Sequence, residues 1–122
     1  LTERGIEEPQ LHWYGTSVGE VTGNIIESEP FLKVGIGSGA SFTQIQTQLV
    51  GNYNLPNVLC AVAIGKHFSI PDAAIKTAIE NYTPSNSRSQ LIQKNGNQII
   101  IDAYNANPTS MRAAIENFAA MH

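Results

Sequence analysis

The sequence predicts an α/β fold: small antiparallel strands, then two helices, then a second unit that begins strand, strand, loop, helix. Short apolar runs separated by turn residues fill the first half of the chain, and a long apolar segment with helical spacing begins after Gly51. A polar stretch near residue 85 then separates the helices from a β-branched run. The 122 residues are enough for one ordinary core or for pieces of two larger domains.

The first half is expected to form short strands. Four runs alternate with turn residues: 11–14, 20–26, 31–36 and 42–49. In the last run, Ile45 and Leu49 share one face. The run Gly35-Ile36-Gly37-Ser38-Gly39 is similar to a phosphate-binding loop, but no Lys-Ser or Lys-Thr pair follows it and no helix begins there. We therefore expect it to be a flexible turn.

Two helices should follow these strands. The first is expected from about Asn54 to Phe68, and because its apolar residues surround most of the axis, it should be largely buried. For the second helix, Ser69 is the expected N-cap, Asp72 follows three residues later, and the apolar stripe ends near Tyr82.

A domain boundary is expected near residue 83. The segment Thr83-Pro84-Ser85-Asn86-Ser87 has the composition of a linker or hinge, which divides the chain into units 1–83 and 84–122. Beyond it, runs 90–94 and 98–101 flank Asn95-Gly96-Asn97 as a hairpin. A third helix is expected from Pro108, with Asn107 as its N-cap.

Charge and composition exclude several classes of function. Ten acidic and seven basic residues occur without a block of either sign, which argues against a nucleic-acid or anionic-membrane surface. No apolar run approaches the roughly 20 residues of a membrane span. The single cysteine, Cys60, excludes an intrachain disulfide and fits a reducing cytoplasm, and His12 and His67 lack partners at metal-ligand spacing. Because the chain begins without Met, we expect it to be an internal piece of a longer one.

The first candidate site is the pair Asn54 and Asn57, which lie three residues apart where the buried helix should begin. Both amides can then reach one ligand. A carboxamide offers a donor and an acceptor together, matching the N6 donor and N7 acceptor of adenine. The alternative is that Asn54 merely caps the helix and that Asn57 is a solvated residue of its first turn.

The second candidate site follows the β-branched run that ends in Asp102. An acid at the carboxyl end of an α/β strand lies where such sheets bind ligands, and it can accept hydrogen bonds from ribose hydroxyls. Asn105, Asn107 and the helix N-terminus can hold a phosphate or a carboxylate. Arg88, just beyond the linker, can bind phosphate oxygens with its planar guanidinium. The alternatives are a turn-forming Asp, a capping Asn and a solvated arginine.

Taken together, three segments resemble consecutive signatures of the Mur ligase family in order and spacing: 51–57, 84–88 and 102–111. Within that family, Tyr104-Asn105-Ala106-Asn107-Pro108 with Ser110-Met111 after it is most similar to members that add D-alanyl-D-alanine. The resemblance implies the end of a central P-loop-type ATPase domain, followed by the start of a Rossmann-like C-terminal domain that receives the acceptor.

The resemblance also implies roles for individual residues. Asn54 and Asn57 would lie at the adenine of ATP, Asp102 at the ribose, and Arg88 at the phosphates, where it would act as a catalytic residue during domain closure. The cleft for the acceptor would be lined by Tyr104, Asn105 and Asn107. Tyr53 stands where many members have His, and its ring can still stack on adenine. The phosphate loop and the ligands of Mg²⁺ are expected outside this chain.

By the same resemblance, the complete protein would be an ATP-dependent ligase of peptidoglycan precursor synthesis. ATP would phosphorylate the terminal carboxylate of UDP-N-acetylmuramoyl-tripeptide, and the amine of D-alanyl-D-alanine would attack the acyl phosphate. We expect no catalysis by the 122-residue chain alone. Two alternatives stay open: another Mur ligase or a ligase like folylpolyglutamate synthetase, and a catalytically silent binding module of the same fold.

Overall fold

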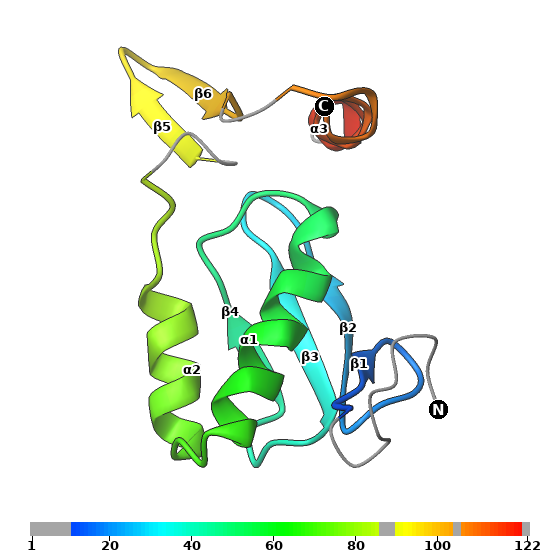
Figure 1. The fold of residues 1–122 in the computed structure, drawn as a ribbon. Coiled ribbons are helices and arrows are strands. Elements are labelled where there is room, and N and C mark those ends of the chain that lie inside the picture. Colours follow the sequence, from blue (N-terminus) through cyan, green and yellow to red (C-terminus); the bar gives the residue numbers. More distant parts are fainter. Residues whose placement is uncertain (1–10, 86–89, 104–105, 121–122) are drawn as a thin grey trace.

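The computed structural model describes residues 11–85, 90–103 and 106–120. Within these ranges, a four-stranded sheet and two helices form the core (Figure 1). A two-stranded hairpin and a third helix lie beyond the end of the core at which the first of these helices begins (Figure 1). The α/β class is as predicted. In the described ranges, no helix combines the length and apolar character needed to cross a membrane.

The sheet contains β1 (Tyr14–Gly15), β2 (Val21–Glu27), β3 (Lys33–Ser38) and β4 (Gln44–Gln46) in that spatial order. The β2–β3 and β3–β4 pairs are antiparallel, as predicted, but β1 pairs with β2 in parallel. The prediction of antiparallel strands is therefore wrong for β1. A small loop returns the chain beside its own start there, so that the two strands run in the same direction.

The glycine-rich run 35–39 is mostly strand, so the prediction of a flexible turn is wrong. Its first four residues belong to β3. A Cβ atom at Gly23 would lie 2.6 Å from the carbonyl oxygen of Gly35, which shows how closely β2 and β3 approach where both lack side chains. The turn comes at the end of the run, where Gly39 has a φ of 93°.

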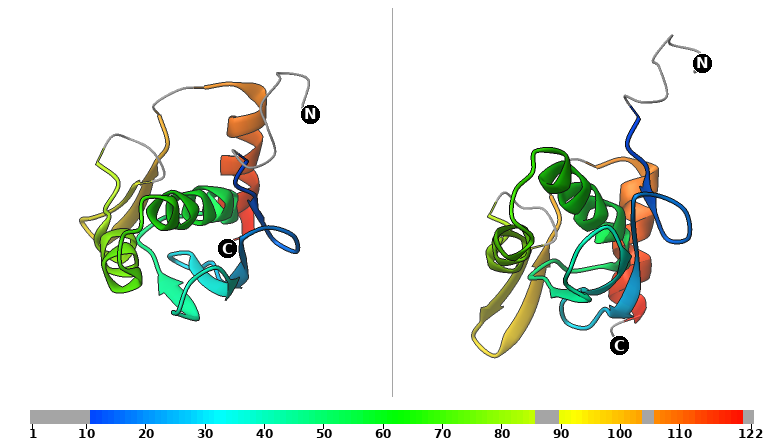
Figure 2. Two further views of the ribbon diagram at one scale, coloured as in Figure 1. Left: turned by 60° about the horizontal axis from the view of Figure 1, so that its bottom comes forward. Right: turned by 90° about the horizontal axis from the view of Figure 1, so that it is seen from below.

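The buried core lies between the sheet and α1 (Leu55–His67), which packs against β1 and β2 (Figure 2). A single 3₁₀ turn, η2 (Asn52–Asn54), precedes α1. The buried apolar side chains are Val21, Leu32, Val34, Ile36, Ile45, Val50, Leu55, Val58, Leu59, Val62 and Ile75. The expectation of a largely buried helix holds for the α1 face directed to the sheet, whereas Ile64 on another face stays exposed.

Helix α2 (Asp72–Asn81) packs beside α1, where Gly65 leaves room for Ile75. Its start differs from the prediction. Ser69 has a φ of 55° and lies beyond the end of α1, and Pro71 occupies the N-cap position of α2 without a side-chain cap. Ser69 is therefore not the N-cap, because the chain needs two further residues to reverse direction before Asp72.

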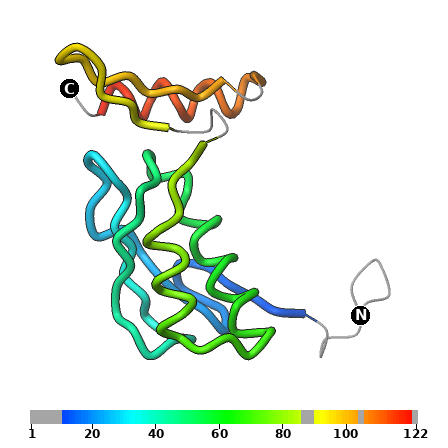
Figure 3. Tube along the Cα trace, turned by 90° about the vertical axis from the view of Figure 1, so that its left-hand side faces the viewer, coloured from blue at the N-terminus to red at the C-terminus, as the bar shows by residue number. Residues whose placement is uncertain are grey.

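The elements after residue 89 follow the predicted order. Strands β5 (Gln90–Lys94) and β6 (Asn97–Ile101) form a hairpin, and positive φ angles at the two turn residues suit an Asn-Gly turn. Helix α3 (Pro108–Ala120) follows, and the Ser110 N–H donates to Asn107 Oδ1 at 3.0 Å, which confirms the predicted cap. Hairpin and helix lie across the end of the core (Figure 3), and α3 has no buried residue.

Candidate functional site

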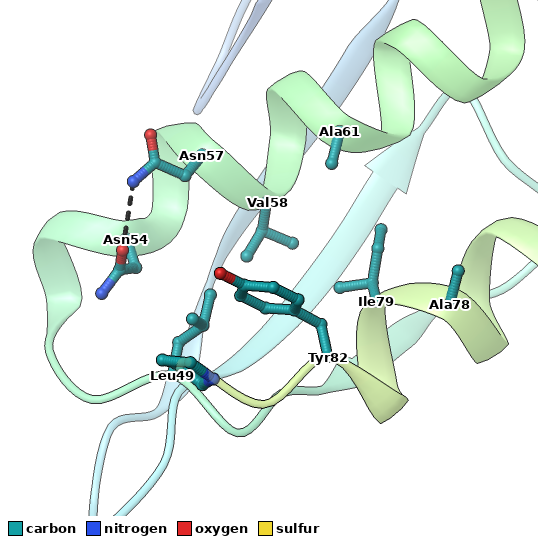
Figure 4. Close-up of a pocket in the computed structure, with 9 residues that line it drawn as sticks. Leu49, Asn54, Asn57, Val58, Ala61, Ala78, Ile79 and Tyr82 are labelled. Atoms are coloured by element: carbon teal, nitrogen blue, oxygen red, sulfur yellow. Dashed lines mark hydrogen bonds between the residues drawn. The ribbon is translucent and has the colours of Figure 1, made fainter. Parts of the chain in front are cut away.

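The two asparagines at the start of α1 contact each other. Asn57 Nδ2 donates to Asn54 Oδ1 at 3.0 Å, and Asn54 Nδ2 donates to the carbonyl oxygen of Val50 at 2.9 Å (Figure 4). Asn54 is only 8% exposed and occupies the N-cap position, yet its side chain makes no capping bond. The alternative of a simple capping residue is therefore wrong for the Asn54 side chain. It holds the incoming chain and orients Asn57.

The Asn57 side chain has hydrogen-bonding groups that the contact with Asn54 does not use. Its residue is exposed, and one hydrogen of its Nδ2 is used by Asn54. The Oδ1 atom accepts no hydrogen bond from the described residues, and the second Nδ2 hydrogen points away from Asn54. An acceptor and a donor thus lie side by side on one oriented amide, which can pair with a ligand edge that carries the opposite groups.

The two amides lie beside an apolar pocket of about 440 Å³ between α1 and α2. Its other lining residues are Leu49, Val58, Ala61, Ala78, Ile79, Tyr82 and Pro84 (Figure 4). The ring of Tyr82 extends from the end of α2 toward α1. A mostly apolar cavity of this size with a few convergent polar groups is typical of small-molecule sites. Sequence reasoning did not identify these walls as a site, since the apolar stripes of both helices indicated only core.

Tyr53 and Asp102 come together from distant parts of the chain. The Tyr53 hydroxyl donates to Asp102 Oδ2 at 3.4 Å, a long hydrogen bond between the turn before α1 and the end of β6. Because Tyr53 immediately precedes Asn54, the contact brings the acid that follows β6 near the start of α1. Asp102 therefore lies near the end of the core at which Asn54 and Asn57 are found.

The remaining predicted site residues are placed differently or not described. Asn107 is exposed, and its Oδ1 accepts the capping hydrogen bond of α3 with one of its two lone pairs. Arg88, Tyr104 and Asn105 lie outside the described residues. In the part of the chain that the structure describes, no three His, Cys, Asp or Glu side chains are grouped so that they could hold a metal ion.

Comparison of the sequence with known proteins finds two kinds of relative. The chain is 38% identical over 69 residues to UDP-N-acetylmuramoyl-tripeptide–D-alanyl-D-alanine ligase of Bacillus subtilis, which covers 56% of the chain and 15% of that protein. It is 32% identical over 74 residues to UDP-N-acetylmuramate–L-alanine ligase of Persephonella marina, with coverage of 61% and 16%. The chain thus spans about a sixth of these relatives. No protein-family model matches it.

Comparison with solved structures agrees with the sequence comparison. MurF from Acinetobacter baumannii superposes with a TM-score of 0.79 at 28% identity, over 91% of this chain and 24% of that one. MurF ligase from Thermotoga maritima, solved in complex with ADP, gives a TM-score of 0.72 over 88% of this chain and 25% of that one. At 15% identity, the second likeness is one of fold. Sequence and structure agree that the chain is similar to one segment of Mur ligases.

Proposed function

We propose that the apolar pocket receives the adenine ring of ATP in an ATP-dependent ligase. The observation that carries this proposal is the oriented amide of Asn57 beside a pocket of apolar side chains. Adenine has two apolar faces and one edge on which the N6 donor and N7 acceptor are adjacent. The free Oδ1 and Nδ2 hydrogen of Asn57 match that edge, and the apolar walls suit the faces.

In the same proposal, the ribose and phosphates extend from the pocket toward the second unit. Asp102, which contacts Tyr53, accepts a hydrogen bond from a ribose hydroxyl, and Tyr53 borders the base. Arg88 binds the phosphates and supports the transferring phosphoryl group. The ADP complex of the Thermotoga maritima relative supports a nucleotide in this fold. We assign no ligand of Mg²⁺ to the described residues, since none of them form a suitable cluster.

The division of the chain is part of this proposal. Residues 1–83 would be the end of the central ATP-binding domain, and residues 84–122 the start of a Rossmann-like acceptor-binding domain. The apolar side chains Met111, Ile115 and Phe118 recur along α3 at helical spacing and are exposed, which suits a helix that packs against further elements of its domain. Nucleotide and acceptor would then meet where the two units face each other.

For the complete protein, we favour addition of D-alanyl-D-alanine to UDP-N-acetylmuramoyl-tripeptide in the cytoplasm. ATP would activate the tripeptide carboxylate as an acyl phosphate, and attack by the dipeptide amine would release phosphate. Tyr104, Asn105 and Asn107 would line the acceptor cleft. The Bacillus subtilis relative supports this choice, whereas the Persephonella marina relative supports a second candidate, addition of L-alanine to UDP-N-acetylmuramate.

Product analysis of the full-length protein that contains this segment separates these activities. The protein is incubated with ATP and one of two substrate pairs: UDP-N-acetylmuramoyl-tripeptide with D-alanyl-D-alanine, or UDP-N-acetylmuramate with L-alanine. Products are identified by mass spectrometry, and released phosphate is measured in the same samples. We expect one phosphate per D-alanyl-D-alanine joined to the tripeptide. Joining of L-alanine to UDP-N-acetylmuramate would identify the second candidate. No ATP consumption with either pair would identify a silent binding module.

A further inference from the structure

A side chain from a distant part of the chain caps the end of α2. Gln48 Nε2 donates to the carbonyl oxygen of Glu80 at 3.0 Å, and the hydroxyl of Thr83 donates to Gln48 Oε1 at 2.8 Å. The Glu80 carbonyl belongs to the last turn of α2, where carbonyl groups have no partner within the helix. One half-buried amide therefore fixes both the end of α2 and the segment that leaves it.

Gln48 lies in a segment that is itself held by the core. We call residues 46–50 the anchoring segment. Thr47 is 1% exposed, and its hydroxyl donates to the carbonyl oxygen of Leu32 at 2.7 Å. The Leu32 N–H in turn donates to the Leu49 carbonyl at 2.8 Å, and Val50 is fully buried. Because its neighbours are fixed on both sides, Gln48 offers a rigid support to whatever it binds.

The anchoring segment supports both sides of the proposed nucleotide pocket. At one end, the Val50 carbonyl binds Asn54, which orients Asn57. Near the middle, Gln48 binds Thr83, which lies between two lining residues, Tyr82 and Pro84. We call Tyr82 and Pro84 the linker wall. One short segment thus holds the Asn54–Asn57 pair and the linker wall at a defined separation.

A second link strengthens the support of α2 without reaching the linker wall. The Glu80 carboxylate accepts the Gln46 N–H at 3.1 Å and pairs with Lys76 Nζ. The Lys76 ammonium and, after it, the Gln46 N–H lower the pKa of Glu80, so this link stays ionised at neutral pH. Among the described residues, Gln48 is the one whose side chain joins the anchoring segment to Thr83.

We propose that Gln48 is a positioning residue for the base of the nucleotide: it keeps the linker wall against the face of the ring. This inference rests on the proposed nucleotide site. Removing both hydrogen bonds of Gln48 leaves Asn57 oriented by Asn54 but lets Tyr82 and Pro84 move. Affinity for a ligand with an adenine ring should fall, whereas affinity for phosphate groups alone should not.

The test measures binding of ADP and of pyrophosphate to the full-length protein by titration calorimetry. Gln48→Met keeps the length of the side chain without its hydrogen bonds, and Gln44→Met is the matched control on an exposed position of β4. Gln48→Met removes two hydrogen bonds that lie outside the ligand contact, so we expect only part of their energy to appear in binding, which predicts about 2- to 10-fold weaker ADP binding. Pyrophosphate binding should be unchanged, and the control should bind both as the wild type does.

Variants of Thr83 keep the inference testable if Gln48→Met does not fold. Thr83 is exposed, so Thr83→Val removes the hydrogen bond between Thr83 and Gln48 at little cost to folding. Thr83→Ser keeps the hydroxyl that makes this bond. We expect weaker ADP binding in the first and recovery in the second. Wild-type ADP affinity in both Gln48→Met and Thr83→Val, or an equal loss for pyrophosphate, would overturn the role of Gln48. A wild-type protein that does not bind ADP would overturn the nucleotide site itself.

Discussion

Replacing Asn54 and Asn57 by Ala, one at a time, separates support of the fold from contact with a ligand. Asn54 is 8% exposed and donates to the Val50 carbonyl at 2.9 Å, so Asn54→Ala leaves a buried carbonyl without this donor. We expect the free energy of unfolding to fall by about 1–3 kcal/mol. Asn57 is exposed and bonds only to Asn54 among the described residues, so Asn57→Ala should change stability by no more than about 0.5 kcal/mol.

Nucleotide affinity should respond in the opposite order. Asn57→Ala removes the donor and acceptor proposed to face adenine, which predicts about 1–3 kcal/mol weaker ADP binding. At about 1.4 kcal/mol per tenfold change, the dissociation constant should rise by roughly 5- to 150-fold. Asn54→Ala leaves the Asn57 amide in place but without its orienting partner, so its loss of affinity should be smaller.

The measurements are urea unfolding and ADP titration of the full-length protein. Asn81→Ala, exposed at the end of α2 and not among the pocket residues, is the matched control. Wild-type ADP affinity in Asn57→Ala would refute the proposed contact with adenine. Wild-type stability in Asn54→Ala would refute its role in holding Val50. Equal losses of stability in both variants would refute the division of roles between the two asparagines.

Two further predictions concern the packing of α2. In Gly65→Ala, the new Cβ would lie 2.8 Å from Cδ1 and Cγ1 of Ile75. We expect this overlap to cost about 1–3 kcal/mol and to outweigh the better helix propensity of Ala. A higher melting temperature of the variant would contradict this prediction. The Lys66 ammonium and then the Ser41 N–H lower the pKa of Asp72 from 3.8 to about 2. The stabilising contribution of the Asp72 carboxylate is complete above pH 4 and is lost as pH falls toward 2. The difference in melting temperature between wild type and Asp72→Asn should therefore close over that range. A difference independent of pH would argue against this role of Asp72.

The sequence was sufficient for elements with strong local signals. Asn95-Gly96 predicted the hairpin because that pair readily takes two positive φ angles, and Asn107 before Pro108 predicted the start of α3. It was not sufficient where backbone approach decides. The glycine-rich run 35–39 has the composition of a turn, yet most of it is strand because β2 approaches closely at Gly23.

The candidate site divides in the same way. By itself, the sequence determined that Asn54 and Asn57 lie one helical turn apart, because α-helical spacing is a local property. Only the tertiary structure decided that Asn54 is buried and bonded to Val50, which leaves Asn57 to face outward. It also decided that Gln48 reaches Thr83, 35 residues further along the chain. Such contacts depend on how helices and strands pack, and no local pattern of residue types encodes which distant groups will meet.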